Sequence, residues 1–95
     1  MTDWPFDQGP NVAAVTCRAV IEGAPILAVI HYSEDHSWAF MDGVTWETEE
    51  GRLVAMKTIL RLDPTVAEVA DLLPGWKAQR TSVGAPWRRM PAPGC

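Results

Sequence analysis

Residues 26–32 read Ile-Leu-Ala-Val-Ile-His-Tyr, an apolar, largely β-branched run that predicts a buried β-strand. A second run of this kind, Val-Ala-Ala-Val-Thr-Cys, spans residues 12–17. Strands that are apolar on both sides lie in the interior of a sheet, so we expect these two runs at its centre. Residues 22–25 between them predict a turn, whereas residues 18–21 fit either an extension of the first strand or a helical turn.

Turn residues mark the remaining strands. Residues 33–36, Ser-Glu-Asp-His, predict a loop that joins two antiparallel strands, and Asp42-Gly43 is a strong turn signal. Further strands are predicted over residues 37–41, 52–56, 76–80 and 87–90. The last two of these would form a terminal hairpin.

One main helix is predicted over residues 64–73. Asp63 suits the N-cap, and Pro64 suits the first helical position, where its missing N–H has no partner to lose. Apolar residues then recur at helical spacing until Pro74-Gly75 ends the pattern. The fold class that follows is α+β: a small, mainly antiparallel sheet of about four to six strands with this helix packed on it.

The length of 95 residues predicts a single domain, with an N-terminal arm over residues 1–10 and a flexible tail over residues 91–95. Trp38 lies on a predicted strand and Trp76 directly follows the predicted end of the helix, so both are expected in the core, where a tryptophan can bury roughly 150–250 Å². No signal peptide precedes the arm, and no apolar run approaches the roughly 20 residues that cross a bilayer. We therefore expect a cytoplasmic protein that does not contact membranes.

Charge is divided unevenly along the chain. Residues 1–50 hold nine acids and one base, residues 51–95 hold three acids and seven bases, and the net charge is −4. Opposite charges could meet across the folded surface, or the acidic half could attract a basic protein. The second interpretation predicts acidic contacts with an exposed tryptophan as anchor. Its candidate residues are Glu34, Asp35, Asp42, Trp46, Glu47 and Trp87.

Chemistry-bearing residues are sparse. Cys17 and His31 offer an alternative nucleophilic pair, although the apolar neighbours of Cys17 favour a packed thiol. His31 and His36 lack the convergent spacing of metal ligands. Residues 87–89, Trp-Arg-Arg, offer an alternative nucleic-acid contact, against which the net negative charge argues. We therefore predict no catalytic residue, cofactor or metal site.

Residues 17–23, 26–32 and 35–43 together resemble the bacterial domain-of-unknown-function family 2185, which is similar to the immunity proteins of polymorphic-toxin systems. The resemblance lies in Ser37-Trp38, Phe40, Gly43 and Asp63-Pro64, which are structural rather than catalytic features. It implies a non-enzymatic, immunity-like domain that binds a basic protein. Residues 44–46 depart from the family, which often carries a dense acidic run at this place.

Overall fold

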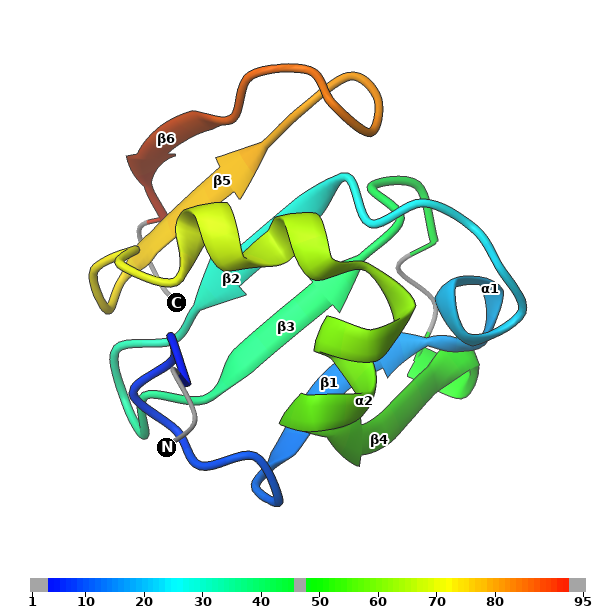
Figure 1. Ribbon diagram of the computed structural model, residues 1–95, viewed down its shortest axis with the longest axis horizontal. Coiled ribbons are helices and arrows are strands. Elements are labelled where there is room, and N and C mark those ends of the chain that lie inside the picture. The colour runs from blue at the N-terminus through cyan, green and yellow to red at the C-terminus, as the bar shows by residue number, and fades with distance from the viewer. Residues whose placement is uncertain (1–3, 46–47, 93–95) are drawn as a thin grey trace.

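The computed structural model describes residues 4–45 and 48–92. Within them the strands are β1 (Ala13–Cys17), β2 (Ala28–His31), β3 (Trp38–Met41), β4 (Gly51–Ala55), β5 (Trp76–Gln79) and β6 (Arg88–Pro91). The helical segments are α1 (Arg18–Ile21), α2 (Met56–Leu62) and two 3-10 helices, η1 (Thr48–Glu50) and η2 (Pro64–Val69). Figure 1 shows their arrangement.

The six strands form one sheet in the order β4-β1-β3-β2-β5-β6. The α+β class and all of the predicted strands are confirmed, and residues 18–21 form the helical turn α1. The sheet is mixed, because β1 and β3 are parallel while every other neighbouring pair is antiparallel. The chain leaves β1 through α1 and returns as β2 two places away, and the β2–β3 hairpin then places β3 in the gap.

The prediction of one main helix over residues 64–73 is wrong. The six-residue 3-10 helix η2 covers only the first part of that range, and the longer helix α2 lies before it, over Met56–Leu62. The predicted start is correct, because the Asp63 side chain accepts a hydrogen bond from the Thr65 backbone N–H and Pro64 lies in the first turn. The predicted fourth strand ends at Ala55, and the chain continues directly into α2.

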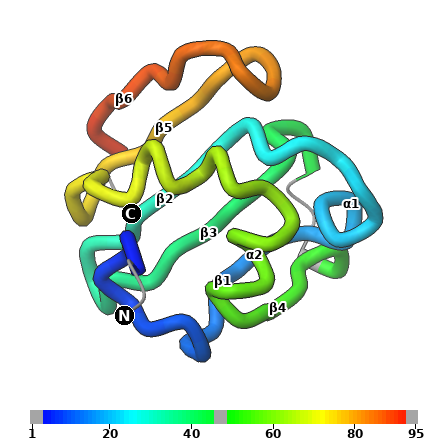
Figure 2. The backbone as a smooth tube through the Cα atoms, viewed as in Figure 1, coloured from blue at the N-terminus to red at the C-terminus, as the bar shows by residue number. Residues whose placement is uncertain are grey.

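One face of the sheet is covered by α2 and η2, and we call it the covered face. The strand register places Arg52, Thr16, Phe40, Val29, Ala78 and Arg89 in one row across this face. The four central side chains of the row are each 0% exposed. Figure 2 shows α2 and the yellow-green η2 crossing in front of the central strands. From the same face, the Arg89 side chain donates a hydrogen bond to Asp71, just after η2, and another to the Glu68 carbonyl within η2.

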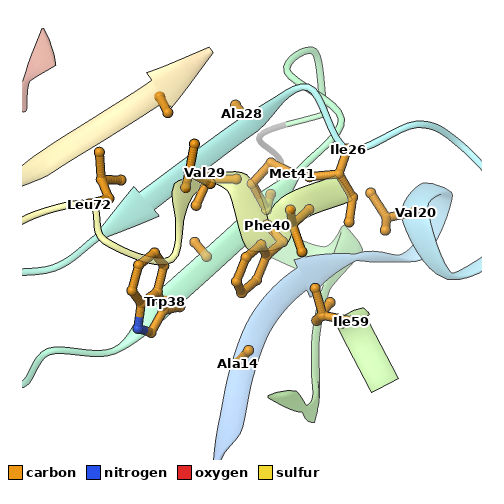
Figure 3. Close-up of a cluster of buried hydrophobic side chains, with 14 of the residues drawn as sticks. Ala14, Val20, Ile26, Ala28, Val29, Trp38, Phe40, Met41, Ile59 and Leu72 are labelled. Carbon is orange, nitrogen blue, oxygen red and sulfur yellow. The ribbon is translucent and has the colours of Figure 1, made fainter. Parts of the chain in front are cut away.

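The core lies between the covered face and these helices. Figure 3 shows Trp38, Phe40 and Ile59 within this cluster of buried side chains. The predicted N-terminal arm is held against it, since the Phe6 ring meets Trp38 edge-on with the ring centroids 5.0 Å apart. Trp38 is fully buried as predicted, and its indole N–H donates to Asp7 Oδ1 at 2.8 Å, a partner that sequence reasoning missed.

Candidate functional site

The opposite face of the sheet presents apolar side chains that the helices do not cover, and we call it the open face. One row crosses all six strands of the sheet and contains Leu53, Val15, Ala39, Ile30, Lys77 and Met90. A second row contains Met41, Ala28, Gln79 and Arg88. Leu53 is 71% exposed, and Val15, Ile30 and Met90 are half-buried. The smaller or more central side chains of the two rows are buried, with exposed fractions of 1% for Ala39, 4% for Ala28 and 8% for Met41.

The composition of the open face is unusual for a sheet with helices on one side. Antiparallel sheets of this kind commonly alternate between apolar residues toward the core and polar residues toward water. Here the three neighbouring strands β1, β3 and β2 place only apolar side chains in the first row, Val15, Ala39 and Ile30. Ala39 lies between Val15 and Ile30 in the same row and is 1% exposed. The open face therefore has an apolar centre.

A groove of about 560 Å³ lies beside the second row of the open face, between the loop after β3 and the β5–β6 loop. Ala28, Gln79 and Arg88 line it from the sheet. The loop after β3 contributes Gly43 and Val44, and the β5–β6 loop contributes Ala85 and Pro86. Val44 is 79% exposed, so the loop after β3 adds an apolar side chain to the groove beside the open face.

Asp42 stabilises the loop after β3, which forms one wall of the groove. Its carboxylate accepts hydrogen bonds from the backbone N–H groups of Val44 and Thr45, at 3.1 and 2.8 Å, and from the Thr45 hydroxyl at 2.7 Å. Burial raises the pKa of Asp42, but these hydrogen bonds outweigh that effect and hold the pKa below its usual value. Gly43 follows with a φ of 86°, a conformation that glycine adopts readily.

Arg80 stabilises the β5–β6 hairpin, whose loop forms the other wall of the groove. Its guanidinium is 0% exposed, lies 2.7 Å from Asp63 Oδ2 and donates to the Thr65 hydroxyl at 2.9 Å. Its Nε donates to the Ile26 carbonyl at 3.0 Å, and the guanidinium stacks 4.1 Å from the Trp87 ring centroid. The β5–β6 hairpin is thus fixed to the segment that begins η2.

The predicted acidic contacts are not brought to one surface. Glu34 and Asp35 are exposed in the β2–β3 loop, whereas Asp42 lies at the opposite end of β3. The four residues of β3 between them span about 10 Å or more. Asp42 is only 7% exposed, and its carboxylate is engaged by its own loop. Trp46 and Glu47 lie outside the described residues.

Trp87, the other predicted anchor, is half-buried beneath Arg80. Within residues 87–89, Arg89 pairs with Asp71 at 2.7 Å, so two of the three side chains are engaged within the fold. Arg88 is exposed and has no ion pair among residues 4–45 and 48–92. A stacking surface with two free arginines, as the nucleic-acid alternative requires, is not formed.

The Cys17–His31 pair is not formed either. Cys17 is fully buried, as expected for a packed thiol, and it lies two residues along β1 from Val15, toward the open face. His31 lies on the covered face, where its Nδ1 donates to the Leu72 carbonyl at 2.7 Å. Strand β3 separates the two strands that carry them.

His31 instead forms a cluster with the N-terminal arm. Its Nε2 lies 3.2 Å from Asp7 Oδ2, and its ring stacks on Trp38 with the centroids 3.9 Å apart. The ring of His36 is a neighbour at 5.8 Å, which the sequence did not predict, and His36 has a φ of 59°. Among the residues that the structure describes, no group of three or more histidine, cysteine or acidic side chains could hold a metal ion.

Comparisons with known proteins add no further constraint. No protein-family model, curated protein or solved structure matches this chain. The resemblance described above therefore stays a prediction. In the described part of the chain, none of the helices has the length and apolar character needed to cross a membrane.

Proposed function

We propose that this chain is a non-enzymatic protein-interaction domain whose open face docks against a partner protein. The supporting observation is the apolar part of the first row, from Leu53 through Val15 and Ala39 to Ile30, on the face away from α2 and η2; Lys77 separates it from Met90. Apolar side chains that stay exposed or half-buried on one face of a small domain favour an interaction site, because leaving them in water is unfavourable.

The dimensions of the open face suit the centre of an interface. Six strands spaced about 4.8 Å apart span about 24 Å, close to the side of about 28 Å of a square with the roughly 800 Å² that each partner buries in a standard interface. Lys77, Gln79 and Arg88 lie on the two strands at one side, where they would form part of a polar rim. Burial of Leu53 alone contributes about 1.5 kcal/mol or more.

A second form of the proposal follows from the resemblance to immunity proteins. In it, the exposed Glu34 and Asp35 of the β2–β3 loop contact a basic protein. The acid-rich first half of the chain supports this form, and complementary charge accelerates such association. The two forms use different surfaces, so one experiment separates them.

Site-specific photo-crosslinking in the producing cell tests the proposal. A photoreactive phenylalanine analogue replaces Leu53 on the open face, Leu73 as a matched control, or Glu34 in the acidic loop. Leu73 is 62% exposed and lies between η2 and β5, away from the open face. We expect a discrete adduct with another protein from position 53 and none from position 73.

A competing charge sharpens this experiment. Met90→Asp places a carboxylate in the same row as Leu53 and should reduce the yield of the position 53 adduct. An adduct from position 34 alone would favour the acidic loop. Equal adducts from positions 53 and 73 would rule out a specific role for the open face.

A further inference from the structure

We propose that the groove at the end of the open face binds a segment of the partner that carries a carboxylate beside an apolar side chain. This inference builds on the proposed function and specifies which chemistry the partner presents. It rests on the charges of the open face, on the residues that line the groove, and on the mismatch that a second copy of the chain would create.

Both ionic side chains in the two rows of the open face are cations, Lys77 and Arg88. Neither takes part in an ion pair within the described residues, whereas Arg18, Arg80 and Arg89 each pair with an acid. An arginine can hold a carboxylate by two parallel hydrogen bonds, and Arg88 lines the groove. Arg88 therefore offers the groove a cation without an ion-pair partner among the described residues, on a protein that is negative overall.

The rest of the groove suits an apolar side chain. Ala28 on its sheet side is small, and Val44 and Pro86 line it from the two loops. Gln79 adds an exposed amide beside Arg88. Asp42 is the one acid that lines the groove among the described residues, and its carboxylate already accepts the hydrogen bonds of Val44 and Thr45. An incoming carboxylate thus meets Arg88 while its apolar neighbour contacts Ala28 and Val44.

A second copy of this chain does not supply that chemistry. Two copies related by a two-fold axis and packed through the open face can be arranged in two ways. One sets β6 against β6 and brings Arg88 and Lys77 near their own copies, which is repulsive. The other sets β6 against β4, whose residue in the first row is Leu53. Neither arrangement sets an acid of the two rows against Arg88 or Lys77, because the rows contain no acidic side chain, so the charges favour a different protein.

Three blocked pentapeptides of equal length serve as probes in an NMR titration of the intact protein. The first alternates glutamate and leucine, the second lysine and leucine, and the third glutamate and serine. We expect the first to shift the backbone amide signals of Gln79 and Arg88 and to bind at least about tenfold more tightly than the other two. Arg88→Glu should weaken it by about tenfold or more and favour the lysine–leucine peptide.

Arg61→Glu is the matched control, because Arg61 is exposed on α2 and has no ion pair in the described part of the chain. It should leave the titration unchanged. Equal binding of all three peptides, signal changes confined to other surfaces, or an unchanged affinity of Arg88→Glu would overturn the inference. A dimer that light scattering detects and that Met90→Asp abolishes would also overturn the inference.

The failure of this inference is distinct from the failure of the proposed function. A specific position 53 adduct without binding of the glutamate–leucine peptide would leave the open face as an interaction surface and remove the groove chemistry. Peptide binding at Gln79 and Arg88 without a position 53 adduct would restrict recognition to the groove.

Discussion

The carboxylate of Asp7 joins the N-terminal arm to the centre of the sheet through His31, whose Nε2 lies 3.2 Å from Asp7 Oδ2. The other oxygen of the same carboxylate accepts the Trp38 indole N–H. Because His31 Nδ1 donates to the Leu72 carbonyl, both ring nitrogens face acceptor oxygens. The Asp7 carboxylate thus contacts two buried rings, those of Trp38 and His31.

Replacing Asp7 with Ala should destabilise the fold by about 1–3 kcal/mol, because it leaves the buried indole N–H of Trp38 without its hydrogen-bond acceptor and removes the carboxylate beside His31 Nε2. Urea denaturation followed by tryptophan fluorescence measures the change. Glu34→Ala, in an exposed loop, is the control and should change the free energy of unfolding by less than about 0.5 kcal/mol. Equal effects of the two changes would contradict the anchoring role of Asp7.

Arg80→Met should cost about 3 kcal/mol, because it leaves Asp63 facing a mostly buried site without its cation. Arg89→Met removes an arginine–aspartate pair of the same 2.7 Å length, but this pair lies at the surface. It should cost less than about 1 kcal/mol, since exposed ion pairs contribute little. Chemical denaturation compares the two variants, and a larger cost for Arg89→Met would be inconsistent with the buried role of Arg80.

Lowering the pH should destabilise the protein through its aspartates. Hydrogen bonds from Ser37 lower the pKa of Asp35, a hydrogen bond from Arg89 lowers the pKa of Asp71, and the pKa of Asp42 is also lowered. A carboxyl with a lower pKa in the folded state stabilises the fold above its unfolded pKa of about 3.9. That contribution is lost as the pH falls through the folded pKa.

The free energy of unfolding should therefore decrease as the pH falls below about 4. Asp42→Asn should show a shallower decrease than the native chain, because the substituted side chain does not titrate. Denaturation curves recorded across the acid range measure both slopes. Parallel curves for the two proteins would show that Asp42 does not contribute to this dependence.

The two faces of the sheet predict opposite responses to truncation. Val29→Ala on the covered face should cost about 2 kcal/mol, because it creates a cavity where the side chain is fully buried. Leu53→Ala on the open face removes more atoms, yet it should cost less than about 0.5 kcal/mol, because Leu53 is mostly exposed. Thermal or urea unfolding distinguishes the two, and a large cost for Leu53→Ala would mean that this residue is covered.

The strands could be predicted from sequence because each apolar run is bounded by turn residues, as at Asp42-Gly43 after β3. The parallel pairing of β1 with β3 could not, since it depends on which strands meet after α1 reverses the chain. The start of α2 at Met56 was not predicted, because residues 52–56 continue the apolar, strand-like pattern up to that residue. The Asp63 cap was predictable, because its acceptor and donor are two residues apart.

The candidate site was harder to predict from the sequence than the strands were. An apolar run such as residues 26–32 indicates a strand with apolar residues on both sides, but it does not say which side a helix will cover. The groove depends on Ala28, Gln79 and Arg88, which come from three strands. The acidic residues near Glu34 and Asp42 are neighbours in sequence, yet a strand separates them in space. Proximity along the chain was therefore a poor guide.

The parallel pairing of β1 with β3 also has a consequence for how the molecule comes apart. It joins only two Cα pairs, whereas β1 matches β4 over five and β2 matches β3 over four. The strands on either side of this junction each have a longer antiparallel neighbour. Partial unfolding or a pulling force should therefore split the sheet into a two-stranded and a four-stranded part along the line between β1 and β3.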